Sequence, residues 1–283
     1  MFVNRKIAFI GPGVMAEAMI GGLIRQRVAE PSALLAAGPG SERLEQLAHK
    51  FGVAVTTDNA AAARQADVTV LSVKPQRLDK VLAGLRGAIP PNALVLSIVA
   101  GAPIAKIANG LQHECVVRSM PNTPAQIGEG ITVWTAAPAV TDEQKSMAAQ
   151  ILGALGEEIY VEEETYLDYA TALSGTGPAY VFLFMEAMVD AGVHLGFPRR
   201  IAEQLVARTV RGSVDYWWNR ADPPHLARLR NQVTSPGGTT AYAMYYLDKM
   251  GFRTAISRAI WAAYERTREL GAEASSHPPE KTE

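Results

Sequence analysis

The hexapeptide Ser235-Pro236-Gly237-Gly238-Thr239-Thr240 combines residue types that can build an anion site. Proline fixes its own φ, and the two glycines let the backbone turn with its N–H groups facing outward. A helical pattern follows from Ala241 to Lys249, so Thr239 or Thr240 would take the N-cap position beside the positive end of the helix dipole. The turn therefore predicts a seat for a small carboxylate. A plain turn between two helices is the alternative, because glycine and proline punctuate loops of every kind.

A second candidate anion site lies near the N-terminus. The apolar run Lys6–Ile10 is typical of a buried strand, and Gly11-Pro12-Gly13-Val14-Met15-Ala16 follows it directly and opens a helical pattern. In a G-x-G-x-x-A sequence between a strand and a helix, Gly11 makes the tight turn and Gly13 lets the backbone approach a pyrophosphate. Ala16 allows the helix to pack closely on the sheet. This stretch predicts a dinucleotide cofactor.

The residues after the second strand bear on the choice between NADPH and NADH. The strand Ala33–Ala37 ends without the acidic residue that would bind a ribose 2′-hydroxyl, and the loop Gly38-Pro39-Gly40 leads instead to Ser41 and Arg43. Both side chains would favour a 2′-phosphate, so NADPH is the expected cofactor and NADH remains possible. A solvated Arg43 with no ligand is the alternative, and Glu42 reduces the local positive charge.

Short apolar runs alternate with helical patterns through the first 162 residues. The expected strands are Lys6–Ile10, Ala33–Ala37, Val53–Val55, Val68–Val73, Leu94–Ile98, Cys115–Ser119, Ile131–Thr135 and Ile159–Val161. This order predicts an α/β fold, a Rossmann-like doubly wound parallel sheet whose ligands lie at the carboxyl ends of the strands. Lys74 and the turn from Ser97 to Gly101 stand at such ends.

The second half of the chain is expected to be entirely helical. A helix beginning at Pro178 is apolar almost all round from Val181 to Val189, and such a helix must be covered on every face. A small helical domain can hardly do this alone, so we expect a subunit interface. The predicted domains are therefore residues 1–162 for the dinucleotide, 163–271 for substrate and dimerisation, and a disordered tail at 272–283.

Composition narrows the classes of protein further. Among 283 residues, 27 Lys and Arg oppose 28 Asp and Glu without a polybasic run, so nucleic acid and membrane are not expected partners. The single cysteine, Cys115, lies in an apolar run, which fits an inert thiol in a reducing cytoplasm. We expect no signal peptide, no apolar stretch long enough to span a bilayer and no metal site, because the five histidines lack ligand spacing. A reductase of a small carboxylate accounts for both anion sites.

Four motifs together resemble the pyrroline-5-carboxylate reductase family. They are V-K-P-Q at Val73–Gln76, M-P-N-T-P-A at Met120–Ala125, S-G-T-G-P-A-Y at Ser174–Tyr180 and S-P-G-G-T-T at Ser235–Thr240. The resemblance extends to about Leu270. It implies NAD(P)H-dependent reduction of the cyclic imine (S)-1-pyrroline-5-carboxylate to L-proline by a homodimer or larger homo-oligomer. It also implies interleaved helical domains, so that the turn of one subunit can complete the site of another.

The resemblance also implies site residues. Cofactor contacts would fall on Ile10, Gly11, Pro12, Gly13, Val14, Met15, Asn59, Ser72, Val73, Lys74, Pro75, Ile98, Val99 and Ala100. The substrate would bind at Ser235, Gly237, Gly238, Thr239 and Thr240. Backbone N–H groups of Gly238 and Thr239 would hold the carboxylate, and the Thr240 hydroxyl would reach the ring nitrogen. Departures from the family pattern occur at Pro223-Pro224-His225-Leu226, Gly38-Pro39-Gly40 and Thr176.

Three other functions fit parts of the sequence. A β-hydroxyacid dehydrogenase shares the architecture, but it needs a catalytic lysine in the first helix after the nucleotide domain, and Thr165–Gly192 contains none. A reductase of another cyclic imine would need only a different pocket size. A non-catalytic dimeric NADPH sensor would have no use for the second anion seat.

Overall fold

The computed structural model describes residues 5–222 and 224–276. The chain folds into two compact units, one comprising Met1–Thr176 with Ala262–Glu283 and the other comprising Gly177–Trp261.

The first unit is built on an eight-stranded sheet with the order β3-β2-β1-β4-β5-β6-β7-β8. Strand β7 runs antiparallel to β6, and the other neighbouring strands pair in parallel. A single 3-10 turn, Thr123–Ile127, joins β6 to β7, which is too short a connection for a parallel crossover. The strands are β1 (Ile7–Ile10), β2 (Leu34–Ala37), β3 (Ala54–Thr56), β4 (Val68–Leu71), β5 (Leu94–Ser97), β6 (Val116–Met120), β7 (Gly130–Ala136) and β8 (Gly156–Tyr160). The expected doubly wound sheet is confirmed.

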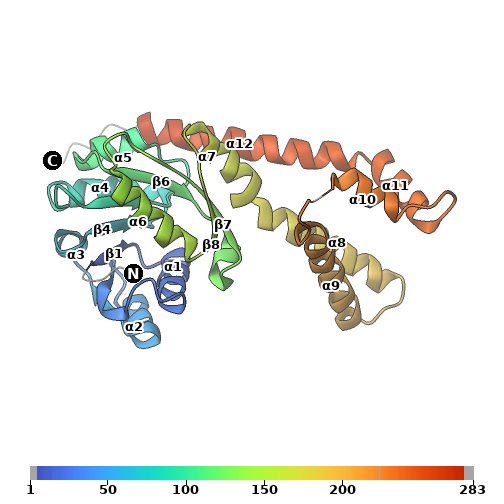
Figure 1. Cartoon of the computed structure of the whole chain (residues 1–283), viewed down its shortest axis with the longest axis horizontal. Coiled ribbons are helices and arrows are strands. Elements are labelled where there is room, and N and C mark those ends of the chain that lie inside the picture. Colours follow the sequence, from blue (N-terminus) through green and yellow to red (C-terminus); the bar gives the residue numbers. More distant parts are fainter. Residues whose placement is uncertain (1–4, 223, 277–283) are drawn as a thin grey trace. The chain divides into compact units, whose positions relative to one another are not determined.

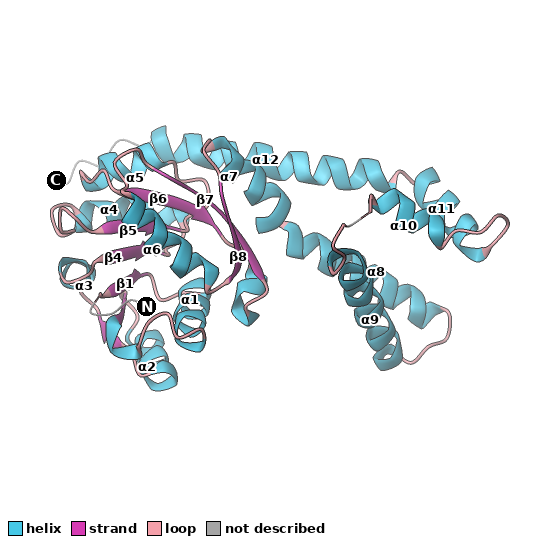
Figure 2. Cartoon of the chain, in the orientation of Figure 1, coloured by secondary structure: helices cyan, strands magenta, loops and turns pink. Residues whose placement is uncertain are grey.

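Helices cover both faces of this sheet, as Figure 1 and Figure 2 show. Successive residues of β1 point to opposite faces, so Ile7 and Phe9 enter one apolar cluster while Ala8 and Ile10 enter the other. The first cluster contains the buried sides of α1 (Val14–Arg25), α2 (Ser41–Phe51) and α6 (Asp142–Gly153). The second contains those of α3 (Asn59–Arg64), α4 (Leu78–Leu85) and α5 (Ile104–Leu111).

The first unit continues beyond the predicted domain boundary at residue 162. Helix α7 (Thr165–Ala170) buries Leu167 against the sheet, and the Arg118 guanidinium on β6 pairs with Glu164 at 3.0 Å and with Asp168 at 2.6 Å. A π-helical turn, Thr171–Gly175, follows α7 directly. The ion pairs of Arg118 with residues around α7 explain why this segment belongs to the sheet unit.

The end of α12 (Phe252–Ser276) also belongs to the first unit. Gly101 adopts a φ of +68°, and a Cβ placed on it would lie 3.4 Å from the Thr267 carbonyl oxygen and 3.5 Å from the Gly271 nitrogen. The helix therefore packs directly on the turn after β5. Residues 272–276, predicted as part of a disordered tail, continue the helix, and residues 277–283 lie outside the described residues.

The second unit consists of helices with few buried apolar side chains. It holds α8 (Gly177–His194), α9 (Arg199–Trp218), α10 (Leu226–Gln232), α11 (Thr239–Lys249) and the first turns of α12. Only Val189, Ala202 and Val206 form a buried cluster among its described residues. Phe182 and Leu183 on α8 are 64% and 66% exposed, in keeping with the predicted subunit interface.

The expectation that no stretch could span a bilayer is wrong by length and composition. The helical run Thr165–His194 is 30 residues long and passes that test, with 11% of its most apolar window buried. Three acidic residues, Asp168, Glu186 and Asp190, interrupt its apolar sequence. The first of these pairs with Arg118 in the sheet unit. Within this chain, the first part of the run is thus part of a folded domain.

Candidate functional site

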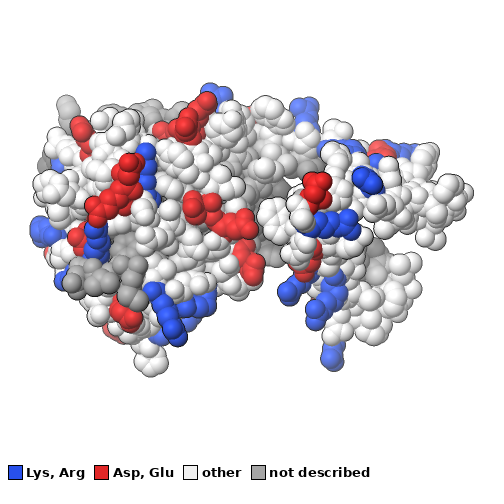
Figure 3. All heavy atoms as spheres, viewed as in Figure 1, with Lys and Arg blue, Asp and Glu red and all other residues white. Residues whose placement is uncertain are grey.

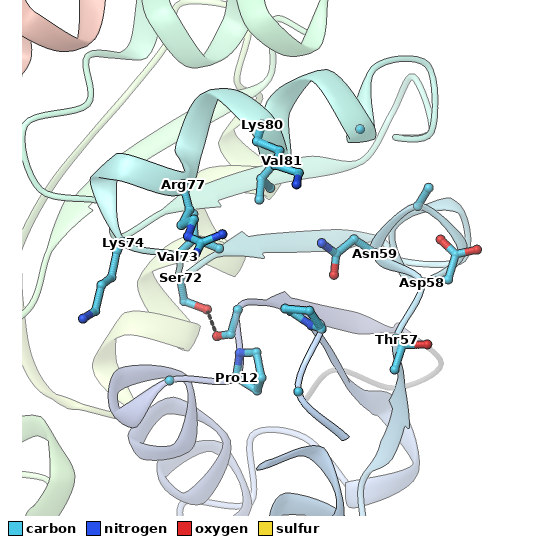
Figure 4. A pocket seen from close by; sticks show the side chains of 17 residues that line it. Pro12, Thr57, Asp58, Asn59, Ser72, Val73, Lys74, Arg77, Lys80 and Val81 are labelled. Carbon is cyan, nitrogen blue, oxygen red and sulfur yellow. Dashed lines mark hydrogen bonds between the residues drawn. The ribbon is translucent and has the colours of Figure 1, made fainter. Parts of the chain in front are cut away.

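A pocket of about 880 Å³ opens at the carboxyl ends of β1, β2 and β4 (Figure 4). This is where a doubly wound sheet binds dinucleotides. The glycine-rich segments after β1 and β2 form one side, and the start of α3 and one face of α4 form the others. The lining residues are Gly11, Pro12, Gly13, Gly38, Pro39, Gly40, Thr57, Asp58, Asn59, Ala60, Ser72, Val73, Lys74, Arg77, Lys80, Val81 and Gly84.

The floor of the pocket requires glycine at position 11. Gly11 has a φ of +101°, and a Cβ on it would lie 2.8 Å from the Ser72 carbonyl oxygen. Its N–H donates to the Ala37 carbonyl at 2.9 Å, and the Ser72 hydroxyl donates to the Gly11 carbonyl at 2.7 Å, as the dashed line in Figure 4 marks. These bonds fix the turns after β1 and β4 against each other. The bare backbone leaves room for a pyrophosphate to approach.

Asn59 supplies an unsatisfied polar atom beside this floor. Its Oδ1 is buried without a hydrogen-bond partner among the described residues, and its side chain lines the pocket. Neighbouring Asp58 caps α3 by accepting from the Ala61 N–H at 2.9 Å. Because buried polar atoms are normally paired, the free oxygen indicates a ligand donor such as a ribose hydroxyl. A dinucleotide fits the residues present.

The predicted cofactor residues divide into two groups. The pocket brings together Gly11, Pro12, Gly13, Asn59, Ser72, Val73 and Lys74. It is not lined by Ile10, Val14, Met15, Ser41, Arg43, Pro75, Ile98, Val99 or Ala100, whose roles stay predictions. Arg77 and Lys80 also line the pocket, although they were not among the predicted residues. The spacing of Leu78, Leu82 and Leu85 could have indicated them, because it buries one face of α4 in the core and leaves the two cations on the face that lines the pocket.

Arg43 is bonded to other groups of the protein. Its Nε donates to the Pro12 carbonyl at 2.9 Å, and its guanidinium pairs with Glu17 on α1. The Lys50 ammonium also reaches Glu17, at 2.7 Å. Hydrogen bonds from Lys50 and from Arg43 lower the pKa of the Glu17 carboxyl. Arg43 thus ties α2 to the glycine-rich turn.

Two of the family-like motifs meet at the end of β6. Asn122 donates through Nδ2 to the Ser174 carbonyl at 3.2 Å and accepts from the Ile131 N–H at 3.0 Å. A Cβ on Gly175 would lie 2.5 Å from the Met120 Cε, so the π-helical turn sits directly on Met120. These contacts hold the Ser174-Gly175 backbone beside the carboxyl end of a central strand.

The Ser235–Thr240 turn has the expected shape but different hydrogen bonds. Gly237 adopts a φ of +70°, and the Gly238 N–H donates to the Ser235 carbonyl at 3.0 Å. That N–H is therefore engaged within the turn in this structure, and its assignment to a carboxylate stays a prediction. Gly238, and neither threonine, is the N-cap of α11, without a side-chain cap bond. The N–H groups of Thr239, Thr240 and Ala241 remain without helical partners, as in any first turn.

Charge on the face in Figure 3 is mixed. Lysine and arginine side chains are interspersed with aspartate and glutamate, and no single-sign patch dominates this view. The balance agrees with 27 basic against 28 acidic residues in the chain. This face therefore offers no basic surface for a polyanion.

Comparison with known proteins gives matches to both parts of the chain. Residues 164–270 match the family model described as pyrroline-5-carboxylate reductase dimerisation, and residues 6–101 match one described as NADP oxidoreductase, coenzyme F420-dependent. A pyrroline-5-carboxylate reductase of Synechocystis is 41% identical over 266 residues, 94% of this chain and 98% of the relative. That of Pseudomonas aeruginosa is 42% identical over 267 residues, 94% of this chain and 96% of the relative.

Solved structures agree with these matches. A Plasmodium falciparum pyrroline carboxylate reductase with NADP bound superposes with a TM-score of 0.86 at 32% identity, covering 95% of this chain and 98% of that one. A pyrroline-5-carboxylate reductase from Coxiella burnetii gives a TM-score of 0.85 at 36% identity, covering 94% and 98%.

Proposed function

The chain belongs to the pyrroline-5-carboxylate reductase family, and we propose that it performs the family's reaction with the residues assigned below. It reduces (S)-1-pyrroline-5-carboxylate to L-proline with NAD(P)H. The observation that carries the assignment within this chain is the glycine-floored pocket with the unpaired Asn59 oxygen. That pocket suits a dinucleotide, and the anion seat at α11 suits a small carboxylate.

The cofactor, when bound, supplies the hydride. In our assignment the Gly11–Gly13 backbone and the start of α1 hold its pyrophosphate, and Asn59 binds the adenosine half. Val73 and Lys74 line the pocket after β4, which lies between β1 and β5 in the sheet. Beyond them, we assign the reacting end to the turns after β5 and β6, including Ile98–Ala100.

The substrate seat is assigned to the turn before α11. Thr239, Thr240 and Ala241 present N–H groups at the positive end of the helix dipole, where a carboxylate is stabilised. Ser235 and Gly237 shape the turn. Gly238 contributes its conformation, because its N–H already donates to the Ser235 carbonyl. A fixed carboxylate determines which face of the ring the hydride meets.

Protonation of the ring nitrogen completes the chemistry. The imine carbon accepts hydride readily once the nitrogen carries a proton, and the electron pair of the C=N bond then moves onto nitrogen, giving the amine. The Thr240 hydroxyl is assigned to hold this nitrogen or to pass it a proton from water. No strong general acid is required if the substrate enters as the iminium ion.

Assembly and location follow from the family. The chain is a homo-oligomer, and the dimerisation model covers the helices with exposed apolar faces. The family consists of soluble enzymes. A cytoplasmic location is part of the proposal and agrees with a single cysteine.

The test is loss of NADPH absorbance with purified protein and pyrroline-5-carboxylate, with proline identified as the product. Thr240→Val is expected to lower kcat by about a hundredfold. Thr240→Ser, which keeps the hydroxyl, should retain most of the turnover. Full activity of Thr240→Val would remove this residue from the mechanism, and NADPH binding without oxidation would indicate that the substrate is another cyclic imine.

A further inference from the structure

The loop after β2 contains no side chain that could bind a phosphate. In dinucleotide folds this loop carries the residue that distinguishes a ribose hydroxyl from a 2′-phosphate. Here it reads Gly38-Pro39-Gly40, and all three residues line the pocket. A Cβ on Gly38 would collide with the Pro12 ring, so the loop is closely packed as well as bare. A charged side chain that recognises the 2′-phosphate must therefore come from another wall of the pocket.

The neighbouring Arg43 is a poor candidate for that charge. It does not line the pocket, and its guanidinium is shared between Glu17 and the Pro12 carbonyl. Ser41 begins α2 and does not line the pocket either. Recruiting Arg43 would require breaking an ion pair that also involves Lys50.

The opposite wall carries two cations, Arg77 and Lys80, that form no ion pair with an acid in the described part of the chain. Arg77, the N-cap of α4, and Lys80 in the first turn of α4 line the pocket together with Val81 and Gly84, at the spacing of one helix face. Leu78, Leu82 and Leu85 on the other face are buried in the core, so this orientation is fixed by packing. Figure 4 shows both cationic side chains on the α4 side of the pocket, across from the labelled Asn59.

The charge balance of the pocket is positive. Lys74, Arg77 and Lys80 face a single acid, Asp58, whose Oδ1 already accepts from the Ala61 N–H. Within residues 5–222 and 224–276, no ion pair occupies Arg77 or Lys80, whereas Lys106 on the adjacent α5 pairs with Asp79 at 2.8 Å. Two unpaired cations on a fixed helix face are suited to a dianionic group.

We propose that Arg77 and Lys80 bind the 2′-phosphate of NADPH across the pocket from the Gly38–Gly40 loop, and that they set the preference for NADPH over NADH. The inference rests on the proposed function for its cofactor. It assigns the specificity to α4 instead of to Ser41 and Arg43.

The experiment measures KM for NADPH and for NADH in four proteins. They are the unaltered enzyme, Arg77→Gln/Lys80→Gln, Arg43→Gln and Arg64→Gln, the last removing an exposed charge from α3 outside the pocket. The double variant should raise KM for NADPH by at least about tenfold, because charge-assisted bonds to phosphate are lost. Its KM for NADH should stay nearly unchanged, and Arg64→Gln should match the unaltered enzyme.

Two results would overturn the inference. Equal rises in KM for NADPH and for NADH in the double variant would place the cations on the pyrophosphate. A rise in KM that is selective for NADPH in Arg43→Gln and absent from the double variant would return the phosphate to α2.

A second measurement does not depend on turnover. The unaltered protein should bind adenosine 2′,5′-bisphosphate more tightly than AMP, in competition with NADPH followed by its fluorescence. The double variant should bind the two nucleotides alike. If the protein binds NADPH selectively but oxidises it with no imine, the proposed function fails while this inference stands. If it reduces the imine but binds adenosine 2′,5′-bisphosphate and AMP with equal affinity, this inference fails while the proposed function stands.

Discussion

The two units of this chain differ in where they keep their apolar side chains. Phe9 in the sheet unit is fully buried, whereas Phe182 in the helical unit is 64% exposed. The sheet unit has apolar clusters on both faces of β1, whereas the buried cluster of the helical unit consists of Val189, Ala202 and Val206 among the residues that the structure describes. One unit covers its own core, and the other leaves its apolar faces for a second copy.

This difference separates binding from assembly. The dinucleotide pocket lies wholly within the sheet unit, so a single chain holds what it needs to bind a cofactor. The helical unit, to which we assign the substrate seat, would cover its exposed apolar side chains on association with a second copy. Stability of the second unit should therefore depend on protein concentration, while cofactor binding should not.

The largest effect is expected from charging the exposed face of α8. Phe182→Glu/Leu183→Glu should raise the dimer dissociation constant by about thirtyfold or more, because interface anchors contribute ~2 kcal/mol or more. Light scattering after size exclusion measures the dissociation. NADPH binding should survive, and Phe182→Leu is the matched control. A dimer that persists in the double variant would place the interface elsewhere.

The next effect sharpens the boundary between the units. Arg118→Met would leave Glu164 and Asp168 facing each other beside a buried position, which should lower the free energy of unfolding by about 3–5 kcal/mol. Arg199→Met, which breaks an exposed pair with Asp190, should cost less than about 1 kcal/mol. Urea unfolding compares the two variants. Similar costs would mean that α7 is not held to the sheet by Arg118.

A third variant acts on the sheet unit alone. Gly11→Ala forces a φ of +101° on alanine and places its Cβ against Ser72, so we expect a loss of stability of about 1–3 kcal/mol. NADPH affinity should fall while the dimer persists. Gly153→Ala, with nothing within 4 Å of the added Cβ, is the control and should be close to neutral. Thermal melting and nucleotide fluorescence report the two effects.

The smallest effect concerns Glu17. Its pKa is lowered in the folded state by Lys50 and Arg43, so its contribution to stability is present above the ordinary glutamate pKa and is lost as the pH falls through the lowered value. The difference in melting temperature between the unaltered chain and Glu17→Gln should be small at neutral pH and should vanish in acid. A difference independent of pH would contradict the ion pair.

Much of the sheet unit could be predicted from local sequence. Apolar runs such as Leu94–Ser97 predicted the strands, because burial on both faces leaves an unbroken apolar pattern. The glycines after β1 predicted the edge of the sheet that binds the cofactor. The capping box of Thr141 and Gln144 is another local signal, because both residues lie at the start of α6. The family motifs predicted the reaction class.

Contacts between distant segments could not be predicted in this way. The pairing of Arg43 with Glu17 depends on how two helices pack, so the engagement of this guanidinium could not be predicted from local sequence. The π-helical turn at Thr171–Gly175 depends on Met120 and Asn122, which are far away in sequence. The Thr239 N–H without a helical partner could be predicted from the helix start. The hydrogen bond from the Gly238 N–H to the Ser235 carbonyl could be recognised only from the geometry of the turn.

The packing of α12 on Gly101 has a consequence for synthesis. The sheet unit is made of residues up to Thr176 and from Ala262 onward, so its last helix is translated only after the whole helical unit. On the ribosome, the turn after β5 must therefore wait uncovered until the C-terminal turns around Thr267 and Gly271 leave the exit tunnel. Completion of the cofactor-binding unit is thereby tied to prior synthesis of the helical unit, and a nascent chain stalled within α11 would still lack the helix that covers Gly101.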